Sequence, residues 1–126
     1  MSGLTLDAGA LIALERGDRT MALLVKRARE AKVTLALPAG ALGQAWRNGS
    51  RQVLLARLVS STDALEIVPL DARTAREAGQ LCGVTQTSDV IDASVVLCAR
   101  ARGHAIATSD GGDLRRLDPE IRLIEV

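Results

Sequence analysis

Short apolar runs alternate with longer amphipathic stretches along the whole chain. The runs have the length of buried strands, and the longer stretches repeat apolar residues at helical spacing. The predicted strands are Gly3–Leu6, Val33–Leu37, Leu65–Val68, His104–Ala107 and Arg122–Ile124. The predicted helices are Ala8–Arg16, Thr20–Ala31, Ala39–Asn48, Gln52–Ser60, Ala72–Leu81, Val90–Arg102 and Gly112–Leu117. Strands that alternate with helices predict a three-layer α/β/α domain with a central, mostly parallel sheet.

The composition fits one compact domain over residues 1–126. Hydrophobic residues make up 48% of the chain and charged residues 25%, which is the balance of a globular domain and not of a disordered chain. The 16 basic and 15 acidic residues give a net charge of +1, so any affinity for nucleic acid has to come from a local patch. No run approaches the roughly 18 apolar residues of a membrane span, and Met1–Leu6 lacks the features of a signal peptide. We therefore expect a cytoplasmic protein with no membrane partner.

Residues that could bind zinc or form disulfides are few. Cys82 and Cys98 form no CxxC pair, and His104 is the only histidine. We expect neither a structural zinc site nor a disulfide, and we interpret both cysteines as reduced core residues. Trp46 is the only aromatic residue, which disfavours proteins that bind single strands by stacking bases on several aromatic side chains.

Acidic residues recur where predicted strands end and predicted helices begin. These acids are Asp7 after the first strand, Asp110 after the fourth, Asp89 and Asp92 at the start of the helix 90–102, and Asp113 three residues beyond Asp110. The carboxyl ends of parallel strands and the N-termini of the following helices share one edge of the sheet. At least three of these carboxylates should therefore converge at that edge.

Two interpretations of these acids remain open. Asp is a favoured N-cap residue and is also favoured in the first helical turn, so each acid taken singly fits a role in starting a helix. Several anions at one edge repel each other, however, unless a cation joins them. Mg²⁺ or Mn²⁺ is the natural cation, because hard divalent ions take oxygen ligands from a few carboxylates.

Three segments resemble motifs of the PIN-domain nucleases, in the same order along the chain. LTLDAGALIALE at residues 4–15 resembles the family's first strand, which ends in an Asp, and DVIDA at 89–93 resembles its later acidic helix start. ATSDGGDL at 107–114 resembles the closing Thr-x-Asp motif with a short helix after it. The chain length also resembles that of the VapC-type toxins of bacterial toxin-antitoxin pairs.

The resemblance implies roles for the acids and for one hydroxyl. It makes Asp7, Asp92 and Asp110 the catalytic acids that bind Mg²⁺ or Mn²⁺, with Asp89 and Asp113 as flanking acids that bind the ion directly or through water. The hydroxyl of Thr108 would support this site.

One position departs from the family pattern. Gln44 stands where a Glu is usual, on the helix after the second strand, and its neutral amide removes one negative charge from the site. Arg47 and Arg51 follow Gln44 by three and seven residues, at the spacing of one helical face. We predict that they bind RNA phosphates, although a solvated helix face also explains them.

The resemblance further implies an endoribonuclease that hydrolyses phosphodiester bonds of tRNA or rRNA and is inhibited by a cognate antitoxin protein. We expect a homodimer, both from the family and from the apolar helices 20–31 and 52–60. The alternative is a PIN-like module that binds RNA or protein and whose catalysis is weakened by Gln44. A phosphohydrolase with an Asp nucleophile is disfavoured, because Gly9 stands where haloacid dehalogenases have a second acid.

Overall fold

Parallel strands form the central sheet of the computed structural model, which describes residues 3–49, 52–61 and 64–126. The strands are β1 (Gly3–Leu6), β2 (Thr34–Pro38), β3 (Leu65–Val68), β4 (Ala105–Thr108) and β5 (Leu123–Glu125). Their order is β3-β2-β1-β4-β5, and every neighbouring pair is parallel. The sheet was predicted as mostly parallel, and within the described residues it is parallel throughout.

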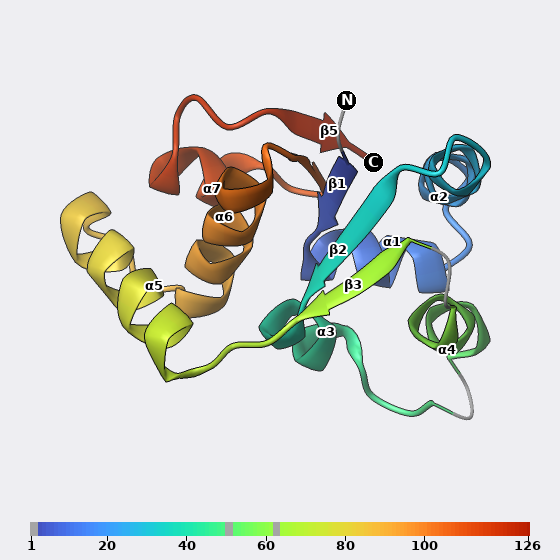
Figure 1. The fold of residues 1–126 in the computed structure, drawn as a ribbon, viewed down its shortest axis with the longest axis horizontal. Coiled ribbons are helices and arrows are strands. Elements are labelled where there is room, and N and C mark those ends of the chain that lie inside the picture. Colours follow the sequence, from blue (N-terminus) through green and yellow to red (C-terminus); the bar gives the residue numbers. More distant parts are fainter. Residues whose placement is uncertain (1–2, 50–51, 62–63) are drawn as a thin grey trace.

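Helices cover both faces of this sheet (Figure 1). One layer holds α1 (Ala8–Glu15), α2 (Arg19–Glu30) and α4 (Val53–Ser60), and the other holds α5 (Ala72–Thr85), α6 (Val90–Arg102) and α7 (Gly112–Leu117). The short helix α3 (Ala39–Ala45) contributes Ala45 to the first layer and Ala41 to the second. The three-layer α/β/α prediction is therefore confirmed.

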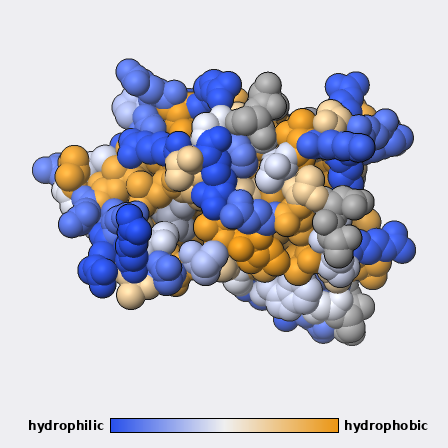
Figure 2. All heavy atoms as spheres, in the orientation of Figure 1, coloured by the Kyte–Doolittle hydropathy of each residue, from blue (hydrophilic) through white to orange (hydrophobic). Residues whose placement is uncertain are grey.

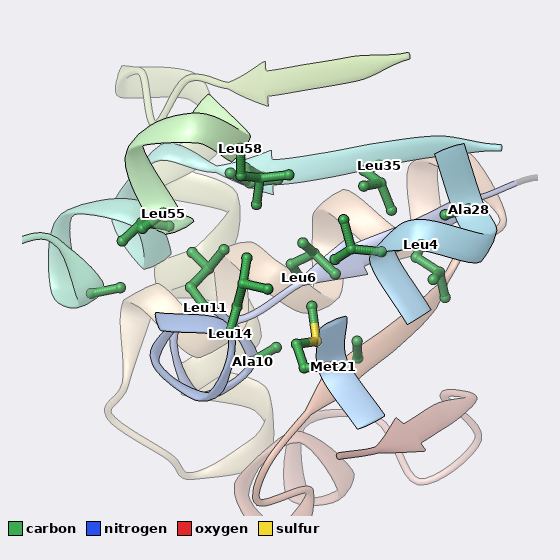
Figure 3. Close-up of a cluster of buried hydrophobic side chains, with 14 of the residues drawn as sticks. Leu4, Leu6, Ala10, Leu11, Leu14, Met21, Ala28, Leu35, Leu55 and Leu58 are labelled. Carbon is green, nitrogen blue, oxygen red and sulfur yellow. The ribbon is translucent and has the colours of Figure 1, made fainter. Parts of the chain in front are cut away.

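The core lies between the sheet and each helical layer. Alternate residues of β1 point to opposite faces, because successive strand side chains alternate. Leu4 and Leu6 pack with side chains of α1, α2 and α4, as Figure 3 shows for Leu11, Met21 and Leu58. Both cysteines are buried and free, as predicted.

Two helix boundaries differ from the prediction. Helix α3 ends at Ala45, not at Asn48, because the Gln52 side chain binds the chain beyond it: its amide donates to Ala45 O, and its Oε1 accepts from the N–H groups of Arg47 and Asn48. Helix α5 runs on from the predicted Leu81 to Thr85. The remaining ends shift by one residue or not at all.

The surface is mixed in character, and no single described helix is long and apolar enough to cross a membrane. Helices α5 and α6 together reach the required length and composition, but they are bent by 105° relative to each other. Figure 2 shows hydrophobic atoms exposed in the middle of the molecule, between hydrophilic side chains at both ends. This region includes the edge strand β3, where Ile67 is 43% exposed.

Candidate active site

The acids lie where the strand order of the sheet reverses direction. Strand β1 is in the middle of the sheet; the chain continues from β1 to β2 on one side, whereas β4 and β5 lie on the other side. In open α/β sheets such a reversal leaves a crevice at the carboxyl ends of the two strands, and ligands bind there. Asp7 follows β1 and Asp110 follows β4, so both flank this crevice.

Asp7 is held in a buried and fully specified position. Its carboxylate Oδ1 accepts a hydrogen bond of 2.8 Å from Ala10 N and so caps α1, and the residue is only 7% exposed. Burial raises the pKa of Asp7, while hydrogen bonds from the Thr108 hydroxyl and from Ala10 N oppose the rise, and the charge of Asp110 adds to it. The capping role predicted for Asp7 is confirmed. Its second carboxylate oxygen, Oδ2, takes no part in the capping hydrogen bond.

Thr108 connects Asp7 with the next acid along the edge. Its hydroxyl hydrogen-bonds to Asp7, and the same Oγ1 accepts from Asp110 N at 3.1 Å. Asp110 in turn accepts from Gly112 N at 3.2 Å and is exposed. Asp110 is not the N-cap of α7, because Gly111 occupies that position. The Asp110 carboxylate is instead fixed by a tight turn.

Asp89 and Asp92 form the third part of the acidic edge. Asp89 caps α6 through a bond of 2.9 Å from Asp92 N, as expected. The pKa of Asp92 is raised to about 6, first by burial and then by the charges of Asp89, Asp7 and Asp113. Asp7 therefore interacts electrostatically with both Asp92 and Asp110. Asp89, Asp92 and Asp113 also line a pocket of about 740 Å³.

The side chains at the acidic edge have the type of ligand atom that a hard divalent cation requires. Carboxylate oxygens are the ligands that Mg²⁺ and Mn²⁺ prefer. Burial is the main cause of the raised pKa of Asp7 and Asp92, and the charges that shift these pKa values are those of other acids and not of a basic residue. Within residues 3–49, 52–61 and 64–126, no three His, Cys, Asp or Glu side chains are already arranged to hold an ion. Binding would therefore need side-chain rotation: the exposed Asp113 could turn toward the ion, and Asp110 would have to give up its hydrogen bond from Gly112 N.

A glycine beside Asp7 keeps two loops in contact. A Cβ atom at Gly9 would collide with Ser109 Oγ and would lie 3.5 Å from Asp7 Oδ1. The first turn of α1 thus reaches the loop after β4 only because residue 9 lacks a side chain. The sequence interpretation gave Ser109 no role, and the glycine two residues after Asp7 is the signal that could have indicated this contact.

Of the residues predicted to act from α3, those that the structure describes are not brought into the acidic pocket. Gln44 is exposed on α3, which begins at the carboxyl end of β2, and it does not line the acidic pocket. Arg47 lies beyond the end of the helix, and its guanidinium donates to Gly43 O and Trp46 O. The helical face that related Gln44 to Arg47 therefore ends at Ala45. Arg51 lies outside the described residues, and both arginines stay predictions.

The raised pKa of Asp92 predicts how the stability of the protein depends on pH. A carboxyl group with a folded pKa of about 6 and an unfolded value of 3.8 contributes stability below pH 4 that is lost as the pH rises through 6. Such a shift corresponds to about 3 kcal/mol if fully buried, and we reduce this to about 1–2 kcal/mol because Asp92 is half-buried.

We therefore expect Asp92→Asn to be more stable than the wild type at pH 8 by about 1–2 kcal/mol in the presence of a chelator, with little difference at pH 4. Urea unfolding at both pH values measures this, with the exposed Glu120→Gln as the control. Equal pH dependence of the wild type and Asp92→Asn would show that Asp92 is not the titrating group.

Comparisons with known proteins identify the family of the chain. The family model for the PIN domain matches residues 4–119, while no curated protein matches the chain in sequence. One similar solved structure is VapC20 of Mycobacterium tuberculosis, described as a sarcin-ricin loop cleaving toxin, with 18% identity, a TM-score of 0.69 and 98% of each chain covered.

Two further solved structures share the fold over nearly the whole chain. VapBC2 from Rickettsia felis, bound to a DNA fragment from its promoter, has 15% identity, a TM-score of 0.68 and 98% of each chain covered. FitAcB from Neisseria gonorrhoeae has 16% identity and a TM-score of 0.64 over 97% of this chain and 96% of that one. At these identities the structures establish a shared fold. Because the family model matches all but the ends of the chain, this protein belongs to the PIN domain family.

Proposed function

We propose that this protein is a metal-dependent endoribonuclease, and that it is the toxin of a VapBC-type toxin-antitoxin pair. The observation that carries the proposal is the position of Asp7, which interacts electrostatically with both Asp92 and Asp110 at the crevice of the sheet. Membership of the PIN domain family and the fold shared with VapC20 support it.

In this proposal Asp7, Asp92 and Asp110 hold Mg²⁺ or Mn²⁺, with Asp89 and Asp113 beside them. The ion, when bound, supplies charge neutralisation at the phosphate and a more acidic water. The chain's own residues position these groups: Thr108 orients Asp7 through its hydroxyl, and the cap at Asp89 fixes the first turn that carries Asp92. Because the pKa of Asp92 is raised to about 6, cation binding at or below that pH also displaces a proton from this site.

The substrate and partners are proposed from the relatives. VapC20 is described as a toxin that cleaves the sarcin-ricin loop, and VapBC2 is described as bound to a DNA fragment from its promoter. We propose rRNA or tRNA as the substrate, a cognate antitoxin as the inhibitor and the cytoplasm as the place of action. A homodimer is proposed because α2 and α4 expose apolar side chains, with Leu23 46% and Val53 51% exposed.

A cleavage assay with total RNA tests the nuclease. We expect fragments with Mg²⁺ or Mn²⁺ and none with a chelator, with activity restored when the ion is added back. Because contaminating ribonucleases imitate weak activity, Asp110→Asn is purified in the same way. Cleavage that continues in Asp110→Asn, or that ignores the chelator, would mean that the acidic edge is not the source of the activity.

A second candidate function is an RNA- or protein-binding module with weakened catalysis. Two observations favour it: Gln44 supplies no charge, and no three acids of the described residues are already arranged around an ion. The acidic edge would then be a remnant of a nuclease site.

Substitution of Gln44 separates the two candidates. Gln44→Glu adds a carboxylate to α3, the helix that follows β2. If Gln44 limits ion binding, we expect half-maximal cleavage at a roughly tenfold lower Mg²⁺ concentration, because supporting groups typically change the affinity of a metal site by this order. Titration of cleavage against Mg²⁺ measures this, with Gln80→Glu on α5 as the control for added surface charge. An unchanged titration would show that the amide belongs to a working site.

A further inference from the structure

The pocket beside the acids is large enough for one nucleotide. Its volume of about 740 Å³ falls within the range of ~300–1,000 Å³ that is typical of small-molecule sites. Its walls are the loop between α5 and α6, the first turn of α6, and α7, three segments that lie together on one side of the sheet in Figure 1. Asp92 belongs both to this wall and to the acidic edge, so an occupant of the pocket would adjoin the reacting phosphate.

The loop between α5 and α6 presents polar side chains that are held in place. Gln86 adopts the left-handed conformation (φ 57°, ψ 43°) that ends α5, and its N–H donates to Cys82 O. Thr87 N donates to the same carbonyl at 3.0 Å. The backbone of this loop is thus used to cap α5, and within the described residues the side chains of Gln86 and Ser88 make no hydrogen bond to the protein.

Among the described residues, the basic side chain that lines this pocket is Arg116, whereas its neighbour Arg115 does not line it. Arg116 lines the same pocket as the acids, three residues after Asp113 on α7, and it forms no ion pair with the described part of the chain. Arg115 lies about 100° further round α7, and its guanidinium is 3.4 Å from Glu125 Oε1 on β5. Arg116 can therefore bind a phosphate without first breaking an ion pair.

We propose that this pocket binds one unstacked nucleotide of a single-stranded RNA segment, with Arg116 on a phosphate and with Gln86 and Ser88 on the edge of the base. The proposal rests on the nuclease function above and specifies its substrate. A base inside a duplex cannot enter a pocket of this kind, whereas a base in a loop or at an end can. The pocket has no aromatic wall, so hydrogen bonds and not stacking would select the base.

Binding of RNA without cleavage tests this proposal. The probe is a fluorescently labelled 12-nucleotide RNA without secondary structure, measured by anisotropy with a chelator over a salt series that starts at low ionic strength. Each phosphate contact on a single strand contributes roughly 0.7 to the slope of log affinity against log salt. We expect Arg116→Ala to lower the slope by about that amount, Arg116→Lys to keep it, and Arg115→Ala to match the wild type.

The base contact has its own readout. We expect Gln86→Ala to leave the salt slope unchanged but to reduce the differences in affinity among RNAs of different sequence, while the exposed Gln80→Ala on α5 keeps them. The same RNA annealed to its complement should bind more weakly than the single strand.

Three results would overturn the proposal: no RNA binding at the lowest salt, equal slopes for Arg116→Ala and Arg115→Ala, or a duplex that binds as tightly as the single strand. Because the chelator removes cleavage from the measurement, the pocket and the nuclease are judged separately. If the protein cleaves RNA but Arg116→Ala binds RNA as the wild type does, the nucleotide pocket is refuted and the nuclease function is not. If Arg116 contributes to RNA binding but no metal-dependent cleavage occurs, the nuclease function is refuted and the pocket is not.

Discussion

Asp7→Asn is expected to remove RNA cleavage while the protein stays folded. Asp7 is the acid that interacts with both Asp92 and Asp110, and in the proposed site removing its charge takes away one of the carboxylates that would bind the cation. Loss of one such preorganised electrostatic contribution typically costs on the order of 10²–10³-fold in rate. The amide oxygen of Asn can still accept from Ala10 N, so the cap of α1 should persist.

A matched control exists on another helix. Asp71 caps α5 as Asp7 caps α1, with an Oδ1 bond of 2.8 Å from Thr74 N and similar backbone angles (φ −86° and −85°, respectively). Asp71→Asn makes the same chemical change away from the crevice and should keep wild-type cleavage. Initial rates on RNA with Mg²⁺, together with circular dichroism for folding, compare the two. Equal rates for Asp7→Asn and Asp71→Asn would refute the role of Asp7.

Gly3→Ala is expected to cause the largest loss of stability. Residue 3 begins β1 and pairs with Thr34 of β2. A Cβ atom there would lie 2.5 Å from Thr34 O and would collide with the His104 imidazole, which is itself held by Thr5 Oγ1 at 3.1 Å. Neither neighbour can move freely, because one is the backbone of the central sheet and the other is buried. Overpacking of this kind costs roughly 1–3 kcal/mol.

Urea unfolding measures this loss against a second glycine. A Cβ atom at Gly79 on α5 would meet nothing within 4 Å, so Gly79→Ala should gain about 0.5–1 kcal/mol from helix propensity. If Gly3→Ala unfolds at the wild-type urea concentration, β1 and β2 do not pair as closely as the structure places them. The expected changes in the free energy of unfolding have opposite signs at the two positions. They therefore distinguish a steric clash at Gly3 from a general effect of replacing glycine by alanine.

Local patterns predicted most of the elements and the residues that start them. Strands Gly3–Leu6 and Leu65–Val68 and helix Val90–Arg102 occur with the predicted boundaries, because hydrophobic periodicity and capping residues act over a few neighbouring positions. The caps at Asp7 and Asp89 follow the same rule. Helix α3 was predicted too long because the residue that ends it, Gln52, is seven positions beyond Ala45 and acts through its side chain.

The candidate site divides in the same way. The acidic residues, their positions after strands or at the starts of helices, and the resemblance to the PIN family follow from the order of residues along the chain. The pairing of β1 with β4, which brings Asp7 to Thr108 across about 100 residues of chain, is seen only in the folded molecule. The fold also places Arg116 in the wall of the pocket that Asp89, Asp92 and Asp113 line, whereas Arg115 pairs with Glu125. The physical reason is that strand order and the direction of a side chain depend on contacts between segments far apart in sequence, which periodicity along the chain does not encode.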